Sequence, residues 1–376
     1  MTPRLVGFAL VSAAALFAAC TSHTNPVAAV NRALVQAADT VTIDSFPFMP
    51  NVHVAALPTL PDTLRPAGFN DIGEVVGYLS GRVWHWEGSR GLQFFTNPPG
   101  THVGDAFNTY ALNNLGDVAV AIGPDTSSTG QAAYFDWYGV LHYLRPLSKF
   151  TPDCGLFAIN DNREALGYCA AGAGYLPTIW TPSGNPVPIE PGGGAPYGVG
   201  TWTALSNSGY LFGDSITTGL VFTPQRQLRH LSPAFYFISG GLNDNGQVTG
   251  SIFDGQHGVE QAAAWFSDTA TTLGVHGVGW TISDDSIVAG ISDGSYTGTS
   301  FGWVWTPHTG VQRLPGLEGF AVLNKETLNG TIMFMNRKRQ IIAQMTKSDG
   351  RTVTYVMWTL PATITRGTPP TFAVAR

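Results

Sequence analysis

Short apolar runs and polar turns alternate along most of this chain, and one ten-residue pattern recurs among them. Its clearest copy is G-L-N-D-N-G-Q-V-T-G at 241–250. Asn and Asp side chains bond to nearby backbone, and Gly adopts the positive φ that closes a tight turn between two strands. Weaker copies stand at 68–77, 111–120, 158–167, 204–213, 281–290 and 334–343. The pattern therefore predicts seven repeat units, each built on a β-hairpin.

Four apolar runs can be followed in most of the units, and the third run ends in an aromatic residue. These aromatic residues are Trp86, Trp137, Trp180, Phe222, Trp265, Trp305 and Trp358. A residue that recurs in every unit is expected to pack in the core, whereas Trp202 and Trp280 have no counterparts and are better candidates for function. Four antiparallel strands in about 40–50 residues is the length of a β-propeller blade.

The two ends of the repeat region complement each other. The seventh unit lacks a clear fourth strand, and residues 51–57 form an isolated apolar strand before the first unit. Pairing the two removes two open sheet edges. We therefore expect an all-β fold, a seven-bladed β-propeller of four-stranded antiparallel blades closed by an N-terminal strand. The expected boundaries are a signal peptide at 1–19, a tether at 20–40, one propeller domain at 41–360 and a tail at 361–376.

The runs A-A-A-W (262–265), L-N-D-N-G-Q-V-T-G (242–250) and F-N-D-I-G-E-V-V-G (69–77) carry a family resemblance. They resemble the bacterial extracellular repeats of the HAF family. That family is defined mainly by its repeat, so the resemblance implies an extracellular repeat protein and no particular reaction. This chain departs from the pattern in the turns, at Arg163, Ser206, Ser283, Ser286 and Arg339. A non-glycine residue in a left-handed turn costs about 1–2 kcal/mol, so Arg163 and Arg339 require support from neighbouring blades.

The N-terminus has the features of an export signal. Arg4 is followed by an apolar run at 5–19 and then by Cys20. Ala18, Ala19 and Cys20 resemble the bacterial lipobox, which implies cleavage before Cys20 and lipid attachment to its thiol; the alternative is an ordinary signal peptide with an incidental cysteine. We expect a protein of the bacterial cell envelope, lipid-anchored to the membrane (the outer membrane in a Gram-negative cell), or otherwise secreted.

Charge and cysteine content narrow the possible partners. Charged residues make up 12% of the chain, the net charge is −6, and the longest basic run is Arg337-Lys338-Arg339. This argues against nucleic acid. We also expect a monomer that meets the membrane only through its lipid. Cys154 and Cys169 lie symmetrically on either side of the Asn160–Arg163 turn. Because exported proteins meet oxidising conditions, we predict a disulfide between these two cysteines.

Motifs of known chemistry are missing from the sequence. The nine histidines show no zinc-type spacing, there is no G-x-S-x-G or H-E-x-x-H motif, and no cofactor or metal is expected. The Asn-Asp turns resemble cation loops, but each supplies at most one or two acids, which favours turn stabilisation. The preferred function is a non-catalytic module that binds a glycan, a peptide or a protein. The alternative is a propeller enzyme, a lyase or hydrolase of polysaccharide.

The segments that differ most between units are expected on the face opposite to the Asn-Asp turns. Function in repeat folds tends to reside in variable loops on a rigid scaffold. The candidate ligand-binding residues in these segments are His102, Asp105, Asp125, Asp254, His257, Asp293 and Tyr296. The alternative is that they only keep the loops hydrated.

Overall fold

The computed structural model describes most of the chain between residues 46 and 367. The described residues are 46–57, 60, 64–104, 111–124, 130–171, 174–189, 202–214, 219–232, 241–254, 259–292, 300–316, 320–322, 333–347 and 353–367. Within these ranges no helix is long and apolar enough to cross a membrane. All of the regular elements are β-strands, which confirms the expected all-β class.

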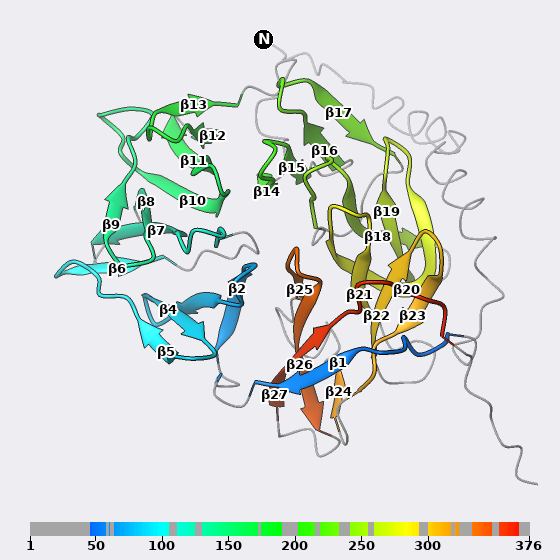
Figure 1. Ribbon diagram of the computed structural model, residues 1–376. Helices are drawn as coiled ribbons and strands as arrows, with labels where there is room; N and C mark the ends of the chain where they lie inside the picture. The colour runs from blue at the N-terminus through cyan, green and yellow to red at the C-terminus, as the bar shows by residue number, and fades with distance from the viewer. Residues whose placement is uncertain are drawn as a thin grey trace, which may run out of the picture.

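The strands form six antiparallel sheets, the blades of a β-propeller, around a central axis (Figure 1). The first blade contains β2 (Arg65–Phe69), β3 (Val75–Leu79), β4 (Arg82–Glu87) and β5 (Gly91–Phe94). The second contains β6 (Thr101–Val103), β7 (Val118–Pro124), β8 (Gln131–Phe135) and β9 (Leu141–Tyr143). The third contains β10 (Cys154–Ile159), β11 (Ala165–Ala171), β12 (Gly174–Trp180) and β13 (Pro186–Pro188). The fourth contains β14 (Trp202–Leu205), β15 (Leu211–Asp214), β16 (Gly219–Phe222) and β17 (Leu228–Leu231).

The last two blades have more strands. The fifth contains β18 (Val248–Asp254), β19 (Val259–Trp265), β20 (Thr271–Ile282), β21 (Val288–Ser292), β22 (Gly302–Thr306) and β23 (Gly310–Arg313). The sixth contains β1 (His53–Ala56), β27 (Val353–Thr359) and β26 (Gln340–Lys347), with β24 (Phe320–Val322) and β25 (Phe334–Met335) both paired to β26.

The expected number of seven separate blades is wrong, and the reason lies in β20. This strand runs for 12 residues without a break. Its first half pairs with β19 and its second half with β21, so the fifth and sixth repeat units share one six-stranded sheet. Gly274 and Gly277 have positive φ inside β20, and this backbone freedom lets the strand continue where the repeat pattern predicts a break.

The N-terminal strand closes the ring, as the sequence predicts. β1 pairs antiparallel with β27, placing His53 opposite Thr359 and Ala56 opposite Val356. This pairing joins the first and last described strands of the chain in one blade (Figure 1). The residues before β1 contact the fifth blade instead, because the backbone N–H of Met49 donates to the carbonyl of Arg313 at the end of β23 (2.9 Å).

The apolar core lies between successive repeat units. Each cluster of buried side chains combines residues of two neighbouring units; Val76 and Val83 of the first unit, for example, pack with Val118 and Val120 of the second. Positions in the repeat are numbered from the first Gly of G-L-N-D-N-G-Q-V-T-G, so that position 8 is the Val. The aromatic residue of the third strand lies opposite position 8 of its own unit, as Trp86 lies opposite Val75.

The second unit corrects one assignment made from the sequence. The residue opposite its position 8, Val118, is Phe135, which is fully buried. Trp137, which the sequence places in the repeated aromatic set, lies two residues further on, beyond the end of β8 and only partly buried. Trp137 is therefore outside the repeat.

Cys154 and Cys169 are joined by a disulfide. They are opposite each other in the β10–β11 ladder, and both are buried between the second and third units. The register shifts between Leu156 and Ala158, so a bulge lies between the disulfide and the turn.

Candidate binding site at the channel mouth

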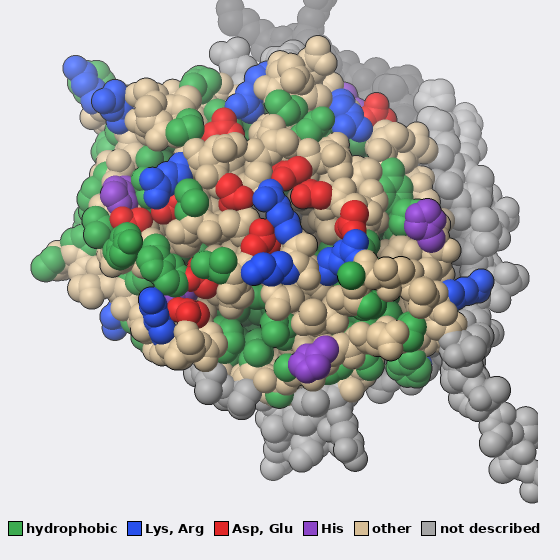
Figure 2. Space-filling model, viewed as in Figure 1, with side chains coloured by type: hydrophobic (Ala, Val, Ile, Leu, Met, Phe, Trp, Pro, Cys, Tyr) green, Lys and Arg blue, Asp and Glu red, His purple; other side chains and the backbone are tan. Residues whose placement is uncertain are grey.

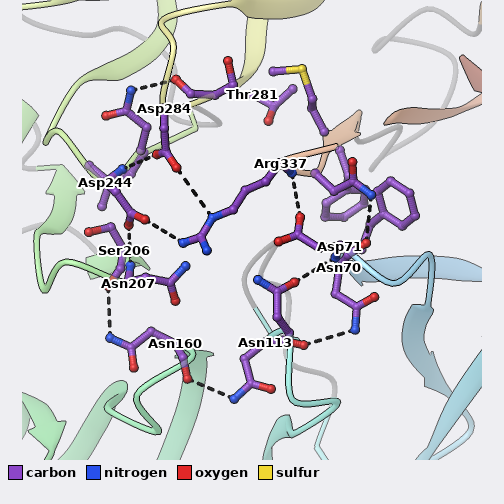
Figure 3. Close-up of a pocket in the computed structure, with 18 of the residues that line it drawn as sticks. Asn70, Asp71, Asn113, Asn160, Ser206, Asn207, Asp244, Thr281, Asp284 and Arg337 are labelled. Carbon is purple, nitrogen blue, oxygen red and sulfur yellow. Dashed lines mark hydrogen bonds and ion pairs between the residues drawn. The ribbon is translucent and has the colours of Figure 1, made fainter. Parts of the chain in front are cut away.

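The Asn-Asp turns of all seven units converge on one face of the propeller, around the central axis (Figure 3). Each turn places its pattern positions 2, 3 and 4 in the wall of a cavity of about 160 Å³. The repeat thus builds the cavity as well as the blades.

Pattern position 3 links five of the seven turns to the turn of the next unit. Within the first turn, Asn70 Oδ1 accepts the backbone N–H of Glu74 (2.9 Å). Across to the second turn, Asn70 Nδ2 donates to the carbonyl of Asn113 (3.2 Å). The same bond from Nδ2 to a backbone carbonyl of the next unit, at 2.8–3.0 Å, is made by Asn113, Asn160, Asn243 and Asn336. Each Asn side chain therefore fixes its own hairpin and the neighbouring one together.

The two Ser residues at position 3 keep only part of this role. Ser206 Oγ accepts the backbone N–H of Tyr210, and Ser283 Oγ accepts that of Ile287, both at 3.1 Å. A hydroxyl can satisfy the turn in this way, but it lacks the amide group that reaches the next unit. This explains why Ser is tolerated at a position where Asn prevails.

Pattern position 4 forms a second series of links between the turns. The backbone N–H of Asp71 donates to Asn114 Oδ1 (2.8 Å), and the N–H of Asn114 donates to Asp161 Oδ1 (2.8 Å). The series continues through Asn207, Asp244 and Asp284, and the N–H of Arg337 donates to Asp71 Oδ1, with distances of 2.6–2.8 Å. Asp and Asn both supply the required oxygen, which is why they interchange at this position.

Arg337 is the exception at position 4, and its side chain extends into the cavity (Figure 3). Its Nη2 lies 2.7 Å from Asp244 Oδ2, while Nη1 and Nε lie 3.5 Å from Asp161 and Asp284. The opening of this cavity on the face of the Asn-Asp turns is the channel mouth. Four carboxylates at the mouth face this one guanidinium, those of Asp71, Asp161, Asp244 and Asp284. The formal charge of the five groups is about −3 at neutral pH.

The protonation equilibria reflect this crowding. Burial raises the pKa of Asp284, and the negative charges of Asp244 and Asp285 raise it further, against the opposing effects of the hydrogen bond from the backbone N–H of Asp244 and of the charge of Arg337. Burial alone would lower the pKa of Arg337, but the surrounding carboxylates, led by Asp244, raise it. The arginine is thus held in its charged form within an acidic ring.

Apolar side chains also line the cavity. Pattern position 2 contributes Phe69, Leu112, Ile159, Leu205, Leu242, Ile282 and Met335. Trp280, which has no counterpart in the other units, lines the cavity too. The side chain of Trp202 is outside the described residues. The site therefore combines acidic and amide side chains with apolar ones from position 2.

Three turns hold a non-glycine residue at position 6, and these residues contact neighbouring units or segments. Arg163, Ser286 and Arg339 all have positive φ, between 58° and 62°. Arg163 Nε bonds Asp117 Oδ2 of the preceding unit (2.8 Å), and Ser286 Oγ bonds Gln247 (2.8 Å). Arg339 contacts Asp285 and the carbonyl of Ala362. The predicted support for Arg163 and Arg339 is confirmed.

An exposed apolar strip lies on the turn face beside the mouth, over the first two units. It consists of Ile72, Leu115, Trp137, Tyr138 and Val140; all but the partly buried Trp137 are exposed. Trp137 packs closely against Gly116, next to Leu115, and its ring meets that of His85 edge-on at 5.1 Å. Figure 2 shows charged side chains at the centre of this face and hydrophobic ones gathered to the left.

None of the loop residues selected from the sequence is among the described residues that line this cavity. Asp105, Asp125, His257, Asp293 and Tyr296 lie outside the described residues. Asp254 ends β18, but its side chain is not described; His102 is half-buried in β6. A ligand site on that opposite face stays a prediction. No group of three or more His, Cys, Asp or Glu suited to a metal ion occurs among the described residues.

The cavity on the turn face was not predicted from the sequence, because every repeated residue was interpreted as structural. The signal that was available is Arg337, a cation at a position where the other units carry Asp or Asn.

Comparisons with known proteins agree on the fold. No protein-family profile and no curated protein sequence matches the chain. Among solved structures, an oligogalacturonate lyase in complex with manganese aligns at 10% identity and a TM-score of 0.51, over 83% of this chain and 92% of the lyase. An oligogalacturonate lyase from Vibrio parahaemolyticus aligns at 8% identity and 0.51, over 84% and 98%. A streptogramin B lyase aligns at 11% and 0.45, over 82% and 98%. At these identities the similarity to the two oligogalacturonate lyases shows the propeller fold alone.

Proposed function

We propose that the protein is an exported, lipid-anchored propeller that binds a ligand without transforming it. The observation that carries this proposal is the state of the carboxylates at the channel mouth. Asp71, Asp161, Asp244 and Asp284 each accept the backbone N–H of a neighbouring turn. A general acid or base must exchange its proton with the substrate, whereas these carboxylates hold the ring of turns together. The mouth is thus equipped to attract a ligand and poorly equipped to transfer protons.

The alternative, a lyase or hydrolase of polysaccharide, requires a proton-transfer group near the substrate. A polysaccharide hydrolase uses a pair of carboxyl groups for this step, and the carboxylates at the mouth are already engaged as acceptors of backbone N–H groups. Histidine and lysine are further candidates for the proton transfer of a lyase, and the described residues that line the cavity include neither. This favours binding over catalysis at the channel mouth.

Export and lipid attachment at Cys20 complete the proposal. The apolar run at 5–19 before Cys20 supports it, as does the disulfide between Cys154 and Cys169, because disulfides persist mainly in oxidising compartments. Mass spectrometry of the N-terminal peptide from a bacterial expression host should find a lipid-modified Cys20. The Cys20→Ala variant should leave the membrane fraction; an unmodified, uncleaved N-terminus would contradict the proposal.

The binding role is tested by offering the mature protein a panel of polysaccharides, oligogalacturonate among them, and of short peptides. Two signals are recorded in parallel: product formation, as new reducing or unsaturated ends, and ligand-induced change in melting temperature. We expect stabilisation by at least one ligand with no product. Product formation that persists in highly purified protein would overturn the non-catalytic role.

A further inference from the structure

We propose that the turn face binds a basic, apolar peptide segment of a partner protein, with an arginine of the peptide at the channel mouth and an apolar side chain on the adjacent strip. This inference rests on the proposed binding function and names the class of ligand. Three independent features carry it: an excess of negative charge at the mouth, a guanidinium already bound there, and an exposed apolar strip that begins at the same turns.

The charge at the mouth favours a cation. Among the described residues that line the cavity, Arg337 is the one cation that faces Asp71, Asp161, Asp244 and Asp284, so the formal charge of this set stays negative. The carboxylates remain accessible: the side chains of Asp244 and Asp284 are 24% and 43% exposed. Carboxylates that converge on a cavity lined in part by apolar side chains concentrate the electric field there and raise the local concentration of cations.

Arg337 shows which cation the mouth accommodates. Its guanidinium donates to Asp244 at 2.7 Å but stands 3.5 Å from Asp161 and Asp284, so it satisfies one carboxylate closely and two loosely. A planar guanidinium presents several donors in a fixed geometry that matches carboxylates. Asp161 Oδ2 already accepts Asn114 Nδ2 (2.9 Å), so a second guanidinium from a ligand would meet Asp284 Oδ2, which lies 3.5 Å from Arg337.

The apolar strip extends the site outward from the mouth. Leu115 belongs to the second Asn-Asp turn, one residue from Asn114 in the cavity wall. Trp137 packs on Gly116, and Tyr138 and Val140 follow it. Tyr138 is 87% exposed and Val140 is 53% exposed. Aromatic side chains held in place on a surface are frequent anchors of protein interfaces.

The composition of the strip favours a peptide over a glycan. Sugars stack on flat aromatic rings, but three of the five strip residues, Ile72, Leu115 and Val140, are aliphatic. Branched aliphatic side chains fit Leu, Met or Phe of a peptide, whose burial contributes about 25 cal/mol per Å². Next to an acidic mouth, the occupant with matching chemistry is a segment that carries arginine and apolar residues together.

The test uses two blocked peptides of the same length and sequence, with two arginines and two leucines in one and citrulline in place of arginine in the other. Citrulline keeps the shape of arginine without its charge. Binding to the mature protein is measured by titration calorimetry at low salt. We expect the arginine peptide to bind at least about 10-fold more tightly than the citrulline peptide, because the difference is a charge-assisted contact.

Variants of the protein test where the peptide binds. The double variant Asp71→Asn, Asp284→Asn keeps both acceptors of backbone N–H groups and removes two charges. It should weaken binding of the arginine peptide at least about 5-fold. Tyr138→Ala should weaken binding of both peptides about 3-fold or more. The matched control is Phe150→Ala, which removes an equally exposed aromatic residue (84%) from the β9–β10 connection and should have no effect.

Equal binding of the two peptides, or an equal effect of Tyr138→Ala and Phe150→Ala, would overturn this inference. Binding of a glycan at the mouth with no binding of the arginine peptide would also overturn it, while leaving the non-catalytic binding role intact. Turnover of a substrate would instead count against the proposed function. The two failures are thus distinguishable.

Discussion

Arg163 Nε lies 2.8 Å from Asp117 Oδ2, and this ion pair joins the third repeat unit to the second. Asp117 is fully buried, and its carboxylate also accepts Asn113 Nδ2 (3.0 Å). Arg163 occupies pattern position 6, where the repeat usually has glycine, with φ of 61°. A residue that departs from the repeat thus neutralises a buried charge that another unit supplies.

We predict that Arg163→Gly destabilises the protein although glycine suits the backbone better. Breaking a buried ion pair from one side costs about 3–5 kcal/mol, and relief of the left-handed conformation returns about 1–2 kcal/mol. Arg163 is itself 45% exposed, so the lower end of the ion-pair cost applies. We therefore expect the free energy of unfolding to fall by about 1–2 kcal/mol. Chemical denaturation of the variant and the wild type measures this difference.

Arg226 provides the matched control. It also has positive φ (63°), but its side chain is exposed and no ion pair is found for it in the described part of the structure. Arg226→Gly should therefore leave the stability unchanged or raise it by up to about 1 kcal/mol. Equal effects of the two substitutions would show that the ion pair with Asp117 does not support the turn.

The sequence was sufficient to predict the repeat, the closing strand and the pairing of the cysteines, because each depends on local pattern or on symmetry about a turn. It was not sufficient for β20, since glycines at 274 and 277 fit a break between strands as well as a continuous strand with unusual backbone angles. Phe135 and Trp137 stand two residues apart in one run, so only the register of β7 and β8 shows which of them packs in the core.

The candidate site was harder to predict than the fold. The pattern places Arg337 at position 4 of its turn, but it does not indicate that position 4 faces the axis, where four Asp residues from distant units meet. That convergence arises from closure of the ring. The same closure makes symmetric turn residues into a cavity wall, which the argument from variable loops overlooked.

Removal of β1 should open the ring. We expect a variant that begins at residue 58 to lose most of its cooperative unfolding transition, because β27 loses one of its two partners and Met49 and Leu57 leave the core. A variant that begins at residue 45 and lacks 368–376 should melt like the full mature chain. Residues 361–367 are kept because the backbone N–H of Gly367 donates to Gln312 (3.0 Å).

Calorimetric melting of these truncation variants provides the measurement. A synthetic peptide of residues 45–60, added to the protein that begins at 58, should restore part of the lost transition. A protein that melts normally without residues 45–57 would refute closure by β1.

The disulfide should contribute measurably to stability. It closes a loop of 15 residues, which corresponds to about 3 kcal/mol from restriction of the unfolded chain. We expect a reductant to lower the melting temperature of the wild type and to leave that of the Cys154→Ala, Cys169→Ala variant unchanged. The variant also tests the loss of packing, since both sulfur atoms are buried. A wild-type melting temperature that does not respond to full reduction would contradict the prediction.

Asp136 and Asp284 should give opposite pH dependence when each is replaced by Asn. Burial alone would raise the pKa of Asp136, but the hydrogen bonds from His142 and from the N–H groups of Val140 and Tyr138 lower it. Its stabilising effect is therefore present above the unfolded-state pKa of about 3.9 and is lost as the pH falls through the folded-state pKa. Asp136→Asn should lower the melting temperature at pH 7 and approach the wild type in acid.

For Asp284 the sign is reversed. The pKa of Asp284 is raised, with burial as the main cause. The contribution of Asp284 to the stability of the folded protein is therefore most favourable below a pH of about 3.9, and it is lost as the pH rises through the folded-state pKa. Asp284→Asn keeps the acceptor for the N–H of Asp244 (2.8 Å) and removes the disfavoured charge. We expect it to stabilise the protein at pH 7 by less than about 1 kcal/mol, because the side chain is partly exposed and screened, and to match the wild type near pH 3.5. Melting curves recorded from pH 3.5 to 7 decide the point: a variant less stable than the wild type at pH 7 would mean that attraction to Arg337 outweighs the penalty of burial.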